Sequence, residues 1–236
     1  MIKDLSKRSH DPEIMDDFDT PLPDLKEVLD DINRVNTILG GFEITNKAVT
    51  RLIQENPKQS YTIVDVGCAE GSMLRKLATS FRKKRHQVNF IGIDLNEEAL
   101  LIAKERSKNF PEISYLKQDI FTANFQNLGC DIVISTLTMH HFNDEAIVRF
   151  IKYFIKIATI GVVINDLQRS VWAYYLFKLF SLIFIKTRVA KIDGLISIRR
   201  AFIRKELISY TKNLPGVNHK IEWKWAFRYL WLIRKT

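Results

Sequence analysis

The sequence is poor in cysteine, with only Cys68 and Cys130 among 236 residues. The spacing of these two thiols matches neither a metal-binding pair nor a redox motif, and so few thiols exclude a disulfide-stapled secreted scaffold. The first residues also lack the apolar stretch that a signal peptide needs. We therefore expect a cytoplasmic protein without a metal centre.

Long hydrophobic runs and repeats are missing too. The segment Val171–Ile185 is apolar nearly all round, but it is shorter than the ~20 residues of a bilayer span and carries Lys178. It is therefore interpreted as a buried helix or as a helix that covers a ligand site. The chain has no internal repeat and no low-complexity segment. Its length, with 46% hydrophobic and 27% charged residues, fits one globular domain with decorations.

The net charge of +9 is unevenly placed. Residues 1–33 are strongly acidic, whereas residues 186–236 carry the basic excess. A basic region of this kind attracts nucleic acid, anionic lipid or an acidic substrate, but it is equally compatible with a solvated surface. Charge alone therefore leaves the partner open.

Apolar strand-like runs alternate with helix-like segments through the middle of the chain. This alternation is typical of βαβ units, and hence of a mostly parallel sheet with helices on both faces. The predicted strands are 61–66, 88–93, 113–116, 130–135 and 161–164, with two more in 217–233, and the predicted helices between them are 72–81, 97–107 and 145–157. The fold class is therefore α/β, Rossmann-like, with seven strands.

Two segments are predicted to lie outside the core of strands and helices. Residues 1–58 are predicted to form a helical lead-in, with one helix from Asp24 and another near 44–54, and residues 59–236 to form the main domain. Residues 168–202, between the fifth strand and a final helix, are predicted to form a helical cap.

The strongest local signal is the segment from Asp65 to Ser72, which contains Gly67, Ala69 and Gly71 at a strand-to-helix turn. Glycine lets the backbone turn sharply and approach a ligand, and the helix that follows presents free N–H groups. A lone turn of this kind is weak evidence, because many βα loops share it. Its value comes from the acids that follow.

Two carboxylates end the next two strands. Asp94 lies 27 residues after Gly67, where nucleotide-binding folds hold ribose hydroxyls. The alternative is a cap for the next helix, and its place after the glycine turn favours ribose. Asp119 is placed to accept a hydrogen bond from an adenine amine, with a surface turn as the alternative.

Two adjacent histidines, His140 and His141, follow the fourth strand. This is the edge of an open α/β sheet where ligands bind, so either histidine is a candidate base or acceptor contact. One of them could instead cap a helix or pack in the core. No third metal ligand lies near them in the sequence.

The segments VDVGCAEG, IGIDLNEEAL, LKQDIF and CDIVISTLTMHHF resemble successive motifs of class I S-adenosylmethionine-dependent methyltransferases. The resemblance covers about residues 61–166 and is nearest to bacterial methyltransferases of small molecules such as quinones and polyketides. It implies S-adenosylmethionine as the cofactor. It departs from the family at Ala69, which replaces a frequent glycine and makes NAD a poorer fit. The implied cofactor contacts are Asp65, Gly67, Cys68, Ala69, Gly71, Asp94, Leu95, Asp119, Ile120 and Thr136.

The acceptor is less defined. We expect methylation of an oxygen or carbon on a small, apolar molecule such as a phenol, quinone, polyketide or lipid, since the cap is so apolar. The candidate acceptor contacts are Asn165, Asp166, Arg169, Arg199 and Arg200. A nucleic-acid methyltransferase is an alternative, suggested by the basic C-terminal region and its aromatic residues. No Asn-Pro-Pro-Tyr type motif, which would point to amino-group methylation, follows the fourth strand. A non-catalytic cofactor-binding or membrane-associated protein remains an alternative, and peripheral membrane contact and a homodimer stay open.

Overall fold

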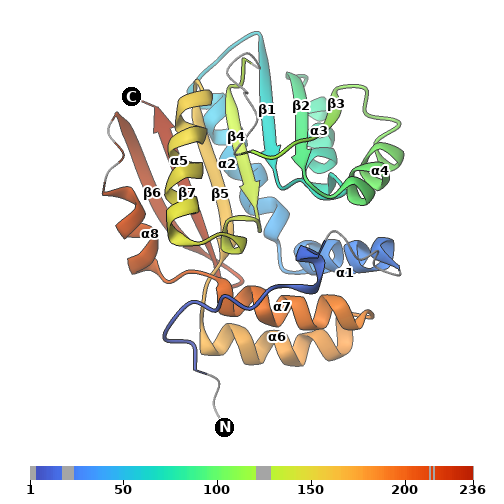
Figure 1. Ribbon diagram of the computed structural model, residues 1–236. Coiled ribbons are helices and arrows are strands. Elements are labelled where there is room, and N and C mark those ends of the chain that lie inside the picture. Colours follow the sequence, from blue (N-terminus) through green and yellow to red (C-terminus); the bar gives the residue numbers. More distant parts are fainter. Residues whose placement is uncertain (1–3, 18–23, 121–128, 213, 215, 236) are drawn as a thin grey trace.

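The computed structural model describes residues 4–17, 24–120, 129–212, 214 and 216–235 (Figure 1). Its centre is a seven-stranded sheet in the order β3-β2-β1-β4-β5-β7-β6. The strands are β1 (Ser60–Val66), β2 (Gln87–Asp94), β3 (Ile113–Lys117), β4 (Ile132–Thr136), β5 (Gly161–Leu167), β6 (Val217–Lys224) and β7 (Arg228–Lys235). The first five are parallel, and β7 runs antiparallel to both of its neighbours. The predicted fold class is confirmed.

Helices cover both faces of the sheet (Figure 1). One face packs against apolar side chains of α2, α3 and α4, and the other against those of α5 and α8. These helices are α2 (Gly41–Glu55), α3 (Ser72–Lys83), α4 (Glu97–Arg106), α5 (Asp144–Ile157) and α8 (Arg204–Thr211). The central strands β4 and β5 are buried on both faces, and each begins with a continuous apolar run rather than an alternating pattern.

The N-terminal region contains a short element ahead of its two longer helices. A short 3-10 helix, η1 (Ile14–Asp16), precedes α1 (Leu25–Ile38). Helix α2 belongs to the core itself, because Leu52 and Ile53 are fully buried in the same cluster as Ile63 of β1. The chain therefore crosses the carboxyl edge of the sheet before it enters the first strand.

The cap is a helical pair, α6 (Val171–Phe184) and α7 (Arg188–Arg200), which lies beneath the carboxyl edge of the sheet (Figure 1). A Cβ atom at Gly194 in α7 would collide with the ring of Phe177 in α6, so glycine allows the two helices to approach closely. The interpretation of 171–185 as a fully buried helix is wrong. Trp172 is 73% exposed and Ile183 is 72% exposed.

The C-terminal hairpin is formed by β6 and β7, as predicted. Its aromatic residues do not share one environment, because the turn between the strands interrupts their alternation. Trp231 is fully buried, whereas Trp225, in the turn, is 66% exposed. Among the helices of the described residues, none combines the length and the apolar character needed to cross a bilayer.

Candidate active site

A large cavity of about 820 Å³ opens at the carboxyl edge of the sheet. The ends of β1, β2 and β4 form one side of it, and η1, α1, α6 and α7 form the other. Of the ten predicted cofactor contacts, all but Gly71 line this cavity, namely Asp65, Gly67, Cys68, Ala69, Asp94, Leu95, Asp119, Ile120 and Thr136. The sequence motifs therefore converge in space as expected from their places at the strand ends.

The glycine turn after β1 is fixed by close packing. The N–H groups of Gly67 and Cys68 both donate to the carbonyl of Ile93, at 2.9 and 3.1 Å. Gly67 has φ +75°, and a Cβ atom there would collide with the Thr138 side chain. Gly71, also left-handed at φ +74°, lies over the Tyr115 hydroxyl. Gly71 thus shapes the turn from outside the cavity.

Asp94 connects the glycine turn to the end of β2. Its Oδ2 accepts a hydrogen bond from the Ala69 N–H at 2.7 Å, and its Oδ1 accepts one from the Asn96 N–H at 2.9 Å. Burial raises the pKa of this carboxyl against the effect of those backbone hydrogen bonds. The helix cap of α4 is Asn96, whose side chain accepts from the Ala99 N–H. The side chain of Asp94 is therefore not the α4 cap.

A second acid, Asp65, lies deeper in the same wall. It is 2% exposed, and its Oδ1 has no hydrogen-bond partner among the described residues. Burial, together with the nearby charge of Asp94, raises the pKa of Asp65 to about 8. Burial also raises the pKa of the Cys68 thiol well above its usual range, which makes this cysteine a poor nucleophile.

The remaining predicted cofactor contacts complete this side of the cavity. Thr136 ends β4, and its hydroxyl lies 3.2 Å from that of Thr45 in α2. Asp119 and Ile120 lie at the edge near β3, where we expect an adenine ring. Phe121, the last residue of the LKQDIF motif, lies outside the described residues.

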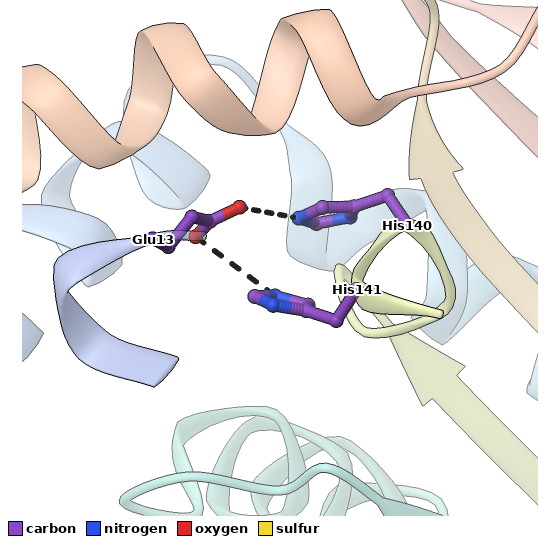
Figure 2. A group of neighbouring side chains, drawn as sticks. All are labelled: Glu13, His140 and His141. Atoms are coloured by element: carbon purple, nitrogen blue, oxygen red, sulfur yellow. Dashed lines mark ion pairs between the residues drawn. The ribbon is translucent and has the colours of Figure 1, made fainter. Parts of the chain in front are cut away.

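The histidine pair lies in the short helix η2 (Met139–His141), and each imidazole is held by a carboxylate. His140 Nδ1 lies 2.7 Å from Asp166 Oδ1 at the end of β5, and His141 Nδ1 lies 2.7 Å from Asp16 Oδ1 in η1. Both Nε2 atoms face Glu13, at 3.4 Å from His140 and 3.9 Å from His141 (Figure 2). A partner on Nδ1 fixes the orientation of an imidazole and leaves Nε2 for chemistry.

The two histidines differ in environment. His140 is 2% exposed, and although burial lowers its pKa, the charges of Asp166 and Glu13 raise it to about 9. His140 is therefore protonated at neutral pH and pairs with both acids. The side chain of His141 is 25% exposed and lines the cavity. His141 is thus the better placed of the two to accept a proton from a bound molecule.

Glu13 is a third side chain that could bind a metal ion together with the two histidines. One donor atom each from Glu13, His140 and His141 lie within 4.8 Å of one another. The expectation that no third ligand lies nearby is therefore corrected, since Glu13 approaches from 127 residues away in the chain. The protonated state of His140 competes with any cation for its Nε2 atom.

Glu13 is positioned by a segment that crosses the cavity mouth. The N–H groups of Ile14 and Met15 donate to the Asp193 carboxylate in α7, at 2.8 and 3.1 Å. Arg200 pairs with Asp16 at 2.6 Å. Arg200 also donates to the His141 carbonyl at 2.7 Å, so it joins η1, α7 and η2. This network closes the wall in which the histidines lie.

The five predicted acceptor contacts take other places. Asn165 donates to the Gly41 carbonyl, and Arg169 pairs with Glu206 at 2.6 Å. Arg199 pairs with Asp11. None of these three residues, nor Asp166 or Arg200, is among the described residues that line the cavity. Asp166 and Arg200 bind the histidine helix η2 directly. Asn165, Arg169 and Arg199 instead form bonds between other parts of the chain.

The cap side of the cavity is formed by the apolar segment that the sequence offered as a ligand-covering helix, and by one arginine that was not predicted. Leu176, Phe177 and Phe180 of α6 form an apolar roof, and Arg228 at the start of β7 forms part of the wall. The apolar run in α6 was a sequence signal for the roof. Arg228 had none, because a lone arginine at a strand end is typical of a surface charge.

Comparison with known proteins agrees with the motif assignment. A family model described as a methyltransferase domain matches residues 63–160. An uncharacterized methyltransferase of Mycobacterium bovis is 33% identical over 88 residues, which cover 37% of this chain and 41% of the relative. A putative 23S rRNA (guanine-N(1)-)-methyltransferase of Bacillus subtilis is 31% identical over 106 residues, 44% of this chain and 36% of the relative. The chain thus spans less than half the length of these curated relatives.

Solved structures resemble the chain over most of its length. The plantazolicin methyltransferase BpumL, in complex with SAH, aligns with a TM-score of 0.67 at 17% identity and covers 91% of both chains. The magnesium protoporphyrin IX methyltransferase of Synechocystis PCC 6803, with bound SAM, aligns with a TM-score of 0.57 at 12% identity, over 92% of this chain and 86% of that one. At these identities the likeness establishes the fold, including the helices outside residues 63–160.

Proposed function

We propose that this chain is a class I methyltransferase, which transfers a methyl group from S-adenosylmethionine to an oxygen or carbon of a small, apolar acceptor. The observation that carries the proposal is the shared cavity. Its sheet side holds the glycine turn and Asp94, which suit a nucleoside and an amino acid, and its cap side is apolar. Both substrates of a methyl transfer would thus lie in one enclosed space.

The main contribution of the protein to this reaction is to position the two substrates. The sulfonium is already an electrophile, so in-line alignment and exclusion of water supply much of the rate. S-adenosylmethionine, held by the glycine turn and Asp94, would supply the methyl group and would be left as a neutral thioether once that methyl carbon is bonded to the acceptor oxygen or carbon. The acceptor's proton must go elsewhere, and we assign it to His141 Nε2. Asp16 fixes that imidazole through its Nδ1 atom, and Glu13 balances the charge that the proton brings.

Several features support an apolar acceptor. Leu176, Phe177 and Phe180 line the cavity, and Ile185 and Ile198 extend the same lining toward α7. Buried methylene groups contribute about 0.8 kcal/mol each, so such a lining favours molecules with alkyl or aromatic parts.

The outer face of α6 suggests how such an acceptor reaches the cavity. Leu179, Leu182 and Ile183 are each more than 60% exposed, and Lys178 and Lys186 are exposed beside them. The one acid in residues 167–203, Asp193, is buried. An apolar helix face surrounded by cations is the pattern of a protein that rests on an anionic membrane surface. We propose this contact, and a cytoplasmic location remains a prediction.

A nucleic-acid acceptor is supported less well, despite the ribosomal RNA methyltransferase among the relatives. The four consecutive basic residues from Arg82 to Arg85 lie at the carboxyl end of α3, at the opposite edge of the sheet from the cavity. Arg82 in that run is engaged by Glu112 at 2.6 Å. A panel of phenols, quinones, lipid-like acids and RNA, incubated with cofactor carrying a deuterated methyl group, would decide by product mass. The proposal expects label in apolar small molecules, and label confined to RNA would contradict it.

A further inference from the structure

A buried guanidinium lies in the cavity wall with most of its hydrogen-bonding capacity unused. Arg228 is 2% exposed and is paired in register with Leu167, at the carboxyl end of β5. Its Nη2 donates to Asn36 Oδ1 at 2.7 Å. Its Nε and Nη1 have no hydrogen-bond partner among the described residues. Buried polar groups in folded proteins are nearly always paired, so these donors call for an explanation.

The surroundings of Arg228 add positive rather than negative potential. A Cβ atom at Gly41 would lie 2.8 Å from Arg228 Cζ, so the guanidinium packs directly against the first residue of α2. That end of a helix carries the positive end of its dipole. The acid that interacts with Arg228, Asp166, directs its oxygens to His140 and to the Leu167 N–H instead. Two positive groups therefore lie side by side, and Asp166 acts on Arg228 through its charge without a hydrogen bond to it.

Such an arrangement is unfavourable unless something offsets it, since a buried charge without a partner destabilises the fold. Burial lowers the pKa of Arg228 to about 10, which still leaves it protonated at neutral pH. Arg228, Asn36 and Gln168 all line the cavity, as do Trp225 and Phe227 from the same hairpin. The side chain of Arg228 is thus part of the wall of the space that a ligand would fill.

We propose that Arg228 forms a binding subsite for a carboxylate on a ligand of this cavity. Charge-assisted hydrogen bonds to a carboxylate would satisfy the free donors, and the helix end beside Gly41 would add to the attraction. The carboxylate belongs either to the acceptor or to the methionine part of the cofactor. Since Trp225, Phe227 and the α6 roof surround the position, the acceptor is the favoured source, which makes it a lipophilic acid. This assignment to the acceptor rests on the proposed function.

The test measures binding, so it does not depend on turnover. Calorimetry would compare a dodecyl-substituted hydroxybenzoic acid with its methyl ester, both in the presence of S-adenosylhomocysteine. The wild-type chain should bind the acid at least about tenfold more tightly than the ester. The Arg228→Met variant should lose that preference, and Arg228→Lys, which keeps the charge, should retain part of it. Arg234→Met removes an arginine from the same strand that pairs with Glu55, and should leave the preference intact.

A second comparison identifies the source of the carboxylate. The same variants would be titrated with S-adenosylmethionine and with its decarboxylated analogue. Among the variants, Arg228→Met alone could lower the affinity for S-adenosylmethionine, while all variants bind the decarboxylated analogue equally. That result would show that the subsite holds the cofactor's carboxylate. If neither the acid preference nor cofactor affinity depends on Arg228 in variants that melt cooperatively, the proposal is overturned. If the wild-type chain prefers the acid over the ester but transfers no methyl group to any acceptor, the proposed function is contradicted while the carboxylate subsite stands.

Discussion

Asp94 Oδ2 accepts a hydrogen bond from the N–H of Ala69 at 2.7 Å, so the acid at the end of β2 braces the turn at the end of β1. The two residues flank the place where the ribose and the methionine part of a nucleoside cofactor would meet. This bond also explains why alanine is tolerated in a position where the family often has glycine. Ala69 adopts φ +45°, and the carboxylate stabilises that backbone conformation.

Replacing Asp94 by Ala should lower affinity for S-adenosylmethionine at least tenfold. Two charge-assisted hydrogen bonds to the ribose diol would be lost, each worth about 1.5–3 kcal/mol. Calorimetry would give the affinity, and circular dichroism would check the fold. Glu98→Ala, an exposed acid one turn away, serves as the control and should bind normally. Unchanged affinity in Asp94→Ala would remove this residue from the cofactor site.

His141→Gln should lower turnover by a factor of about 10² or more, the usual contribution of a positioned base. Cofactor affinity should change little, because the imidazole faces Glu13 rather than the glycine turn. His140→Gln should also slow the reaction, chiefly through loss of its ion pairs with Asp166 and Glu13. His219→Gln alters an exposed histidine of β6 and provides the matched control. Full activity in both site variants would mean that positioning alone suffices.

The free energy of unfolding should depend on pH through Asp65. The pKa of this carboxyl is about 8 in the fold, whereas an unfolded Asp has a pKa of about 3.9. The folded state therefore binds more protons in that window, and stability falls as pH rises from about 4 to 8, by at most about 1.4 kcal/mol per pH unit. Asp65→Asn should flatten this dependence in urea titrations from pH 5 to 8. Parallel profiles for the two proteins would show that Asp65 is ionised in the fold.

The outer face of α6 should bind anionic membranes. The chain is expected to sediment with phosphatidylglycerol vesicles, less with phosphatidylcholine vesicles, and less in high salt, because screening weakens surface charge interactions. A Leu182→Ser, Ile183→Ser double variant should bind several-fold more weakly. Leu101→Ser, on an equally exposed residue of α4, should behave as wild type. If the double variant instead dissociates a dimer and vesicle binding is absent, this face is a contact between two copies.

The sequence predicted the sheet and the cofactor side of the site, because both depend on local order along the chain. A carboxylate such as Asp94 that directly ends a parallel strand must lie at the carboxyl edge, whatever the rest of the chain does. Gly67 and Thr136 follow the same rule, and the structure places them in one cavity.

The cap side of the cavity could not be predicted in the same way. Glu13 and Asp16 reach the histidines only because Asp193 and Arg200 hold the N-terminal segment across the cavity mouth. Such pairings depend on tertiary packing between segments more than 170 residues apart. The sequence favours Arg200 as an acceptor contact, because a basic residue in a cap is a natural ligand for an acid. Its guanidinium instead binds Asp16 and the His141 carbonyl.

The same limit applies to α7. Its sequence has no clear amphipathic spacing, and the Asp193-Gly194 pair is typical of a turn. Packing overrides that preference, since Gly194 is needed beneath Phe177 and Asp193 is needed to bind the backbone of η1.

The central claim is that an apolar acceptor lies between α6 and the sheet, in the same cavity as the cofactor. The most direct test measures kcat/KM for phenolic or acidic acceptors that carry alkyl tails of increasing length. We predict that catalytic efficiency rises with tail length and then levels off, as each buried methylene adds about 0.8 kcal/mol until the cavity is filled. Phe180→Ala, on the inner face, should flatten the rise, whereas Leu182→Ala, on the outer face, should preserve it. Equal efficiency for short polar acceptors and long-tailed ones would contradict the account.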